Sequence, residues 1–153
     1  MDNKRIGIAF VKLGAVGLVA LALSEVFSPT VYQDSVGKDT IGYGETEGVK
    51  KGDRTTPERA LAHLLVRVED DYGNGVKNCV KAPLHQYEYD AYVNLTYNIG
   101  VTAFCNSSIV SWLNKEEYGK ACGSIILYSM AKGKFIRGLY NRRVREYNMC
   151  IGK

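Results

Sequence analysis

The chain has few histidines and cysteines, and neither type is arranged as a metal site usually requires. Its two histidines, His63 and His85, lie at no metal-ligand spacing from the four cysteines, and no Cys-x-x-Cys pair occurs. A metal site is therefore not expected. Repeats, low-complexity tracts and interdomain linkers are also missing, so the 153 residues predict one domain with a hydrophobic core.

The chain also lacks a strong excess of charge of either sign. It carries 20 basic and 16 acidic side chains, a net charge of +4, which is too mixed to indicate a nucleic-acid partner. Basic residues gather near the C-terminal end, where they either favour approach to an anionic polymer such as a cell wall or form a solvated helix face. These residues are Lys132, Lys134, Arg137, Arg142, Arg143 and Arg145.

The cysteines are even in number, which is typical of an exported protein with two disulfides. Three pairings of Cys79, Cys105, Cys122 and Cys150 are possible, and the residues alone do not choose among them. The alternative is four buried thiols in a reducing cytosol.

Residues 6–23 form an apolar run of 18 residues with one charge, Lys12. The run is barely long enough to span a bilayer, and Lys12 opposes insertion. Three interpretations stand: a signal peptide cleaved after residues 20–22, an ordinary first helix, or a releasable anchor that exports the chain uncleaved and then refolds with the domain.

The rest of the chain predicts an α+β fold. Residues 30–48, rich in glycine and β-formers, predict a small antiparallel sheet with a turn at 36–39. Caps and apolar periodicity predict helices over 56–72 (ended by residues 73–75), over 86–99, from Ser107 or Ser108, and over about 116–130.

Glu25, Asp34 and Thr40 are the candidate catalytic residues. Glu25 closes the apolar run, Asp34 follows after a short connection, and Thr40 opens the segment TIGYG. Cleavage of a glycosidic bond needs one protonated carboxyl group that gives its proton to the leaving oxygen and one ionised group that activates water. Glu25 and Asp34 are suited to this division of labour.

The pattern Glu-x8-Asp-x5-Thr followed by Ile-Gly-x-Gly resembles phage-type lysozymes, glycoside hydrolase family 24. The segments APLHQYEYDAYVNLTYNIG and GLYNRRVREYNMC resemble that family's central helix and closing motif. The resemblance implies a mostly helical lysozyme-like fold with a small antiparallel β lobe and a cleft between the lobes. It implies an endolysin that hydrolyses the β-1,4 bond between N-acetylmuramic acid and N-acetylglucosamine of peptidoglycan, without a cofactor.

In that reading Glu25 is the general acid, Asp34 orients water or acts as general base, and Thr40 holds the water. The family's inverting reaction implies carboxyl groups roughly 6.5–9.5 Å apart. Tyr43, Asn98, Arg142 and Arg143 are the candidate substrate contacts, although Asn98 equally suits helix capping and the arginines equally suit a structural tie. Many members carry His after the Gly-x-Gly, where this chain has Glu45, which either acts near the site or points to solvent.

The resemblance further implies disulfides Cys79–Cys105 and Cys122–Cys150, and a signal-anchor-release endolysin. Residues 1–23 would be the anchor helix and residues 24–153 the lysozyme domain. The expected partners are peptidoglycan and, transiently through residues 6–23, the bacterial inner membrane; the protein is expected to be a monomer. It would be tethered first and soluble in the periplasm later, the alternative being host cytoplasm until holin release.

Other functions remain open at this point. A lytic transglycosylase would leave an anhydro-sugar in place of a hydrolysis product. A wall-binding protein without catalysis is a second alternative, although the complete Glu-Asp-Thr set argues against it. A holin-like membrane protein is disfavoured because only one marginal apolar segment occurs.

Overall fold

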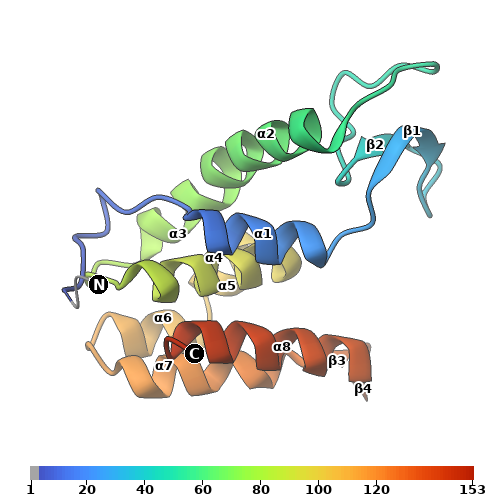
Figure 1. The fold of residues 1–153 in the computed structure, drawn as a ribbon. Coiled ribbons are helices and arrows are strands. Elements are labelled where there is room, and N and C mark those ends of the chain that lie inside the picture. The colour runs from blue at the N-terminus through green and yellow to red at the C-terminus, as the bar shows by residue number, and fades with distance from the viewer. Residues whose placement is uncertain (1–3) are drawn as a thin grey trace.

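The computed structural model describes residues 4–153 and shows a helical lobe and a small β lobe (Figure 1). The β lobe, residues 28–55, stands at the far ends of the first two helices, apart from the rest of the chain (Figure 1). The α+β architecture expected from the sequence is confirmed.

The helices are α1 (Ala15–Leu23), α2 (Pro57–Arg67), α3 (Asn74–Cys79), α4 (Gln86–Ile99), α5 (Val101–Cys105), α6 (Ser108–Leu113), α7 (Tyr118–Ser124) and α8 (Arg137–Cys150). A π-helical segment, η1 (Val68–Gly73), joins α2 to α3, and a 3-10 turn, η2 (Ile125–Tyr128), follows α7. Strands β1 (Ser28–Gln33) and β2 (Asp39–Gly42) pair antiparallel, as do β3 (Met130–Ala131) and β4 (Lys134–Phe135).

The apolar run 6–23 is helical only in α1, over nine residues. The segment before it is irregular, and Ile6 exchanges backbone hydrogen bonds with Leu84 at 2.7 and 2.9 Å. No helix within residues 4–153 is both long enough and apolar enough to cross a membrane.

The two glycines of the run, Gly14 and Gly17, bring α1 against α4. The Gly14 N–H donates to Asp90 Oδ1 at 2.8 Å, and Asn94 Nδ2 donates to the Gly17 carbonyl at 3.0 Å. A Cβ on Gly17 would lie 2.6 Å from Asp90 Cγ, closer than packed atoms tolerate. Glycine here therefore serves close packing inside the folded domain.

The helix expected to end at Gly73-Asn74-Gly75 continues through these residues as η1 and α3, so that prediction was wrong. The reason is tertiary: a Cβ on Gly75 would lie 2.5 Å from Val101 Cγ2. Gly75 makes room for α5, and the helix continues past it.

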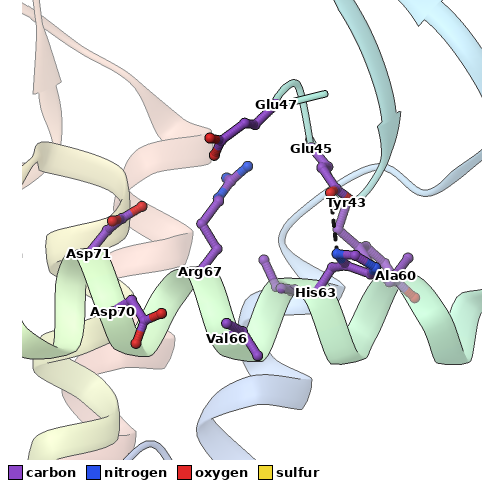
Figure 2. Close-up of a pocket in the computed structure, with 10 residues that line it drawn as sticks. Tyr43, Glu45, Glu47, Ala60, His63, Val66, Arg67, Asp70 and Asp71 are labelled. Carbon is purple, nitrogen blue, oxygen red and sulfur yellow. Dashed lines mark ion pairs between the residues drawn. The ribbon is translucent and has the colours of Figure 1, made fainter. Parts of the chain in front are cut away.

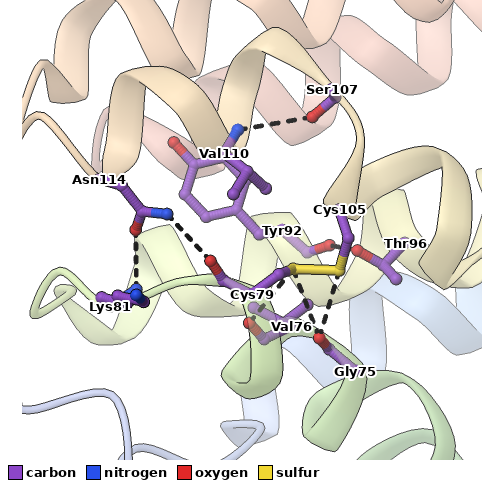
Figure 3. Close-up of a disulfide and its surroundings, with 10 residues drawn as sticks. All are labelled: Gly75, Val76, Cys79, Lys81, Tyr92, Thr96, Cys105, Ser107, Val110 and Asn114. Atoms are coloured by element: carbon purple, nitrogen blue, oxygen red, sulfur yellow. Dashed lines mark hydrogen bonds between the residues drawn. A yellow bond between two sulfur atoms is a disulfide. The ribbon is translucent and has the colours of Figure 1, made fainter.

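The helix α4 crosses the core and matches its predicted bounds. Tyr89 and Tyr92 on α4 are fully buried, as are Leu95 and Phe104. The disulfide Cys79–Cys105 ties α3 to α5 (Figure 3), and Cys122–Cys150 ties α7 to α8. Both confirm the expected pairing.

The helix expected over 116–130 is shorter than predicted. It runs over α7 and η2 and gives way to the hairpin β3–β4, which the sequence analysis missed. The turn of this hairpin places Lys132 and Gly133 at φ 50° and 74°. Two successive residues of positive φ suit a tight hairpin and cannot continue a helix.

Candidate active site

The structure places Glu25 at the point where the chain leaves α1 for the β lobe. Ser24 ends α1, and the Glu25 N–H still donates to the Ala22 carbonyl at 3.2 Å. The side chain lines a hollow of about 350 Å³ whose other lining residues are Val19, Ala22, Leu23, Phe27, Tyr43 and Leu61. A carboxyl group in this mainly apolar setting is poorly solvated, which favours its neutral form.

The electrostatics of Glu25 follow from this position. Its side chain is 26% exposed, and Arg142 Nη1 lies 3.7 Å from its Oε1. Burial raises the pKa of Glu25 above its ordinary value, and the positive charges of Arg142 and Arg67 oppose that rise only in part. The group is thus biased toward holding a proton, as a general acid requires.

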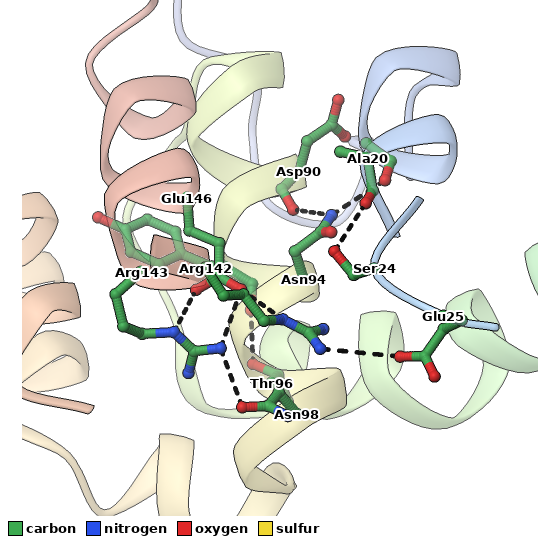
Figure 4. A network of polar contacts seen from close by, with 12 residues as sticks. Ala20, Ser24, Glu25, Asp90, Asn94, Thr96, Asn98, Arg142, Arg143 and Glu146 are labelled. Carbon is green, nitrogen blue, oxygen red and sulfur yellow. Dashed lines mark hydrogen bonds and ion pairs between the residues drawn. The ribbon is translucent and has the colours of Figure 1, made fainter. Parts of the chain in front are cut away.

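Arg142 belongs to a polar network on α8 (Figure 4). Its Nε atom donates to Glu146 Oε1 at 3.2 Å, so that Arg142 bridges Glu146 and Glu25. The side chain of Arg143 is fully buried, pairs with Glu146 at 2.9 Å and donates to Asn98 Oδ1 at 2.9 Å. Arg143 therefore ties α8 to the end of α4 and offers no surface for a substrate, unlike the expected sugar contact.

Asp34 begins the turn between β1 and β2. Its Oδ1 accepts hydrogen bonds from the backbone N–H groups of Val36 and Lys38, both at 2.9 Å. These bonds fix the orientation of the carboxylate. Among the residues that the structure describes, Oδ2 has no hydrogen-bond partner, so this oxygen is available to a ligand.

Thr40 lies in β2, opposite Tyr32 in β1. It is 3% exposed, and its hydroxyl donates to the Lys38 carbonyl at 2.9 Å. The hydroxyl proton points at the Lys38 carbonyl, and the lone pairs of Oγ1 remain able to accept a hydrogen bond from water.

Tyr43 and Glu45 lie where the β lobe meets α2. The Tyr43 ring packs on Phe27 at 5.2 Å and lines the hollow that holds Glu25. Glu45 Oε1 lies 3.3 Å from Nδ1 of His63 on α2 (Figure 2). Glu45 therefore joins the β lobe to α2 through this contact with His63.

The sequence analysis missed Arg67, which reaches the β lobe from the end of α2. Its Nη1 donates to the Gly44 carbonyl at 3.0 Å and its Nη2 to the Tyr97 hydroxyl at 2.9 Å. The sequence around an isolated arginine in an amphipathic helix does not indicate such a role. No group of three or more His, Cys, Asp or Glu side chains within residues 4–153 could hold a metal ion.

The chain is similar to known proteins over most of its length. Residues 22–146 match the sequence profile of the family described as phage lysozyme. The chain is 37% identical over 135 residues to an endolysin of Acyrthosiphon pisum secondary endosymbiont phage 1, covering 85% of this chain and 91% of that protein. It is 30% identical to the SAR-endolysin of Pseudomonas phage phiKMV, with 97% and 92% covered. The crystal structure of a P22 lysozyme mutant superposes with a TM-score of 0.86 at 30% identity, covering 94% of this chain and 100% of that one.

Proposed function

The chain belongs to the phage lysozyme family, and on this premise we propose that Glu25, Asp34 and Thr40 carry its reaction. The protein is an endolysin, a muramidase that hydrolyses the β-1,4 bond between N-acetylmuramic acid and N-acetylglucosamine of peptidoglycan. The observation that carries the site assignment is the half-buried Glu25 carboxyl group, which is biased toward its protonated form and lies beside Arg142.

In the proposed reaction, Glu25 gives its proton to the glycosidic oxygen as the bond to the sugar carbon breaks. Asp34 takes a proton from a water molecule, whose oxygen bonds to that carbon from the opposite face. Thr40 accepts a hydrogen bond from this water. When Glu25 has lost its proton, Arg142 at 3.7 Å stabilises the new carboxylate.

Tyr43 and Asn98 remain proposed substrate contacts, for different reasons. Tyr43 lines the same hollow as Glu25, where its ring offers an apolar face to a sugar. Asn98 is exposed. Its Oδ1 accepts a hydrogen bond from Arg143, which orients the amide group and leaves the side-chain nitrogen able to donate to a substrate. The main role proposed for Arg142 is its charge interaction with the Glu25 carboxyl group, and contact with the substrate is secondary.

Mass spectrometry of purified peptidoglycan digested with this protein tests the reaction. Hydrolysis leaves reducing N-acetylmuramic acid ends, whereas a lytic transglycosylase leaves anhydro ends and a wall-binding protein leaves the polymer intact. Products with anhydro ends, or undigested polymer, would contradict the proposal.

We further propose that the protein acts in the periplasm as a monomer after export through residues 6–23. Support comes from the SAR-endolysin of phage phiKMV, which aligns with nearly all of the chain. In the folded state the same segment docks on α4 through Gly14 and Gly17. Refolding from a membrane would thus bring Glu25 into its site without removal of the segment.

N-terminal sequencing of the periplasmic protein tests the export route. An uncleaved chain, found first in the inner membrane and later in soluble form, is expected. A mature start at Leu23 would indicate a cleaved signal peptide, and a purely cytosolic pool in cells without a holin would indicate an ordinary first helix. Either result would refute the releasable anchor.

A further inference from the structure

Within residues 4–153, Arg67 is the one arginine whose guanidinium group hydrogen-bonds to both the β lobe and α4. Nη1 donates to the Gly44 carbonyl, which follows the strand that carries Thr40, and Nη2 donates to the hydroxyl of Tyr97 on α4. The distances are 3.0 and 2.9 Å. Arg67 is thus a single planar group that contacts both the β lobe and α4.

Both partners of Arg67 are neutral, although acidic side chains are close at hand. Arg67 shares a hollow with Glu45, Glu47, Asp70 and Asp71, and its side chain points from α2 toward the β lobe (Figure 2). No ion pair within 4.0 Å joins Arg67 to a carboxylate in residues 4–153. Its positive charge is therefore left to act on the surroundings, which include Glu25.

We propose that Arg67 is a positioning residue that ties the β lobe to α4 and thereby fixes the β-lobe groups relative to Glu25. The inference rests on the proposed function, because it assigns the general acid to Glu25 and the water-activating groups to the β lobe. The acid must reach the leaving oxygen while the water attacks the sugar carbon from the opposite face, so a small change in the angle between the lobes misplaces one of them.

Only arginine suits this role at position 67. Its guanidinium group is planar and presents separate donors in a fixed fork, so one side chain reaches two acceptors in different directions. A lysine keeps the charge but concentrates its donors on one atom and loses the fork. Arg67→Lys therefore removes the hydrogen bonding to two acceptors but keeps the positive charge.

The charge has its own expected effect, on the pH dependence. The described groups that bear on Glu25 are Arg142 of α8, Arg67 of α2 and Tyr97 of α4. Both arginines favour the ionised carboxylate, and removal of one of them raises the pKa of Glu25 further. Arg67→Gln should then move the alkaline limb of the pH–rate profile to higher pH.

The test compares Arg67→Lys, Arg67→Gln and Tyr97→Phe with Arg59→Gln, a matched loss of one positive charge from an exposed position on α2. With soluble peptidoglycan fragments, both Arg67 variants should lose roughly 10- to 100-fold in kcat with little change in KM. Tyr97→Phe should lose less. The alkaline limb should move only in Arg67→Gln, and Arg59→Gln should match the parent protein throughout.

Amide hydrogen exchange provides a readout independent of activity. The backbone N–H groups of residues 41–45 should exchange faster in both Arg67 variants and at the parent's rate in Arg59→Gln. The backbone N–H groups of α4 should stay protected in every variant. Parent-like kcat in Arg67→Lys, or unchanged exchange over 41–45, would overturn the tie. If Glu25→Gln stayed active, the proposed function would fail instead, and the exchange result would still decide whether Arg67 holds the lobes.

Discussion

Arg142 Nη1 lies 3.7 Å from Glu25 Oε1, so the last helix of the chain reaches the carboxyl group that follows the first. Arg142 is held in turn by Glu146, one helical turn further along α8. Two opposing effects act on this carboxyl group. Burial favours its protonated form, and the guanidinium group of Arg142 favours its ionised form. A general acid needs both, since it must hold a proton before the reaction and release it during the reaction.

Replacing Glu25 by Gln should abolish most of the activity while the fold is kept. General acid catalysis alone contributes roughly 10²- to 10⁴-fold, so we expect lysis of peptidoglycan to fall at least about 100-fold. Turbidity loss of purified cell walls measures the activity, and thermal unfolding checks the fold. Near-normal lysis by the folded variant would remove Glu25 from the mechanism.

The same variant should be more stable than the parent at neutral pH. Because the pKa of Glu25 is raised in the folded state, the folded chain binds more protons than the unfolded chain between the ordinary and the raised pKa. The contribution of Glu25 to the free energy of unfolding therefore falls as the pH rises through that interval. Urea unfolding at several pH values should show the advantage of Glu25→Gln at neutral pH and its disappearance below the ordinary pKa of glutamate.

Gly17→Ala should destabilise the domain although alanine favours helices. The added Cβ would lie 2.6 Å from Asp90 Cγ, and Asp90 is buried and held by Gly14. We expect a loss of about 1–3 kcal/mol in the free energy of unfolding. Gly123→Ala is the matched control, because no atom lies within 4 Å of its Cβ, and it should gain about 0.5–1 kcal/mol. Equal stabilisation by both substitutions would contradict the close contact of α1 with α4.

Loss of either disulfide should lower the stability by similar amounts. The bridges close loops with sequence separations of 26 and 28 residues, and each is expected to contribute about 3–4 kcal/mol in the chain-entropy model. The double variants Cys79→Ala/Cys105→Ala and Cys122→Ala/Cys150→Ala should each unfold about 10 °C below the parent in a calorimetric scan. An unchanged melting temperature in either double variant would show that its bridge does not constrain the unfolded chain.

Local features of the sequence were sufficient for several elements. The periodic apolar residues of α4, bounded by Gly100 at φ 89°, matched the predicted bounds 86–99. Ser107 caps α6 and Thr56 caps α2, as their positions before apolar runs indicate. These signals act between residues a few positions apart, so they are readable without the fold.

Other features were not predictable from the sequence, because the structural role of a glycine or an arginine depends on residues that lie far away along the chain. The glycines at 73–75 predict a helix stop, yet Gly75 makes room for Val101 and the helix continues. Arg143 suits either a sugar contact or a structural tie by its place in the sequence, and its burial against Glu146 and Asn98 favours the tie. The sequence shows the residue type, and only packing shows which surface it meets.

The candidate site divides in the same way. The residue types and spacing of Glu25, Asp34 and Thr40 were set by the sequence, because the chemistry needs two carboxyl groups and a hydroxyl in a short segment. The raised pKa of Glu25 and the link from Arg67 to the β lobe come from the tertiary structure alone. Desolvation and charge interaction depend on groups brought together across the fold, such as Arg142 from α8 and Arg67 from α2, and no local pattern in the chain records their approach.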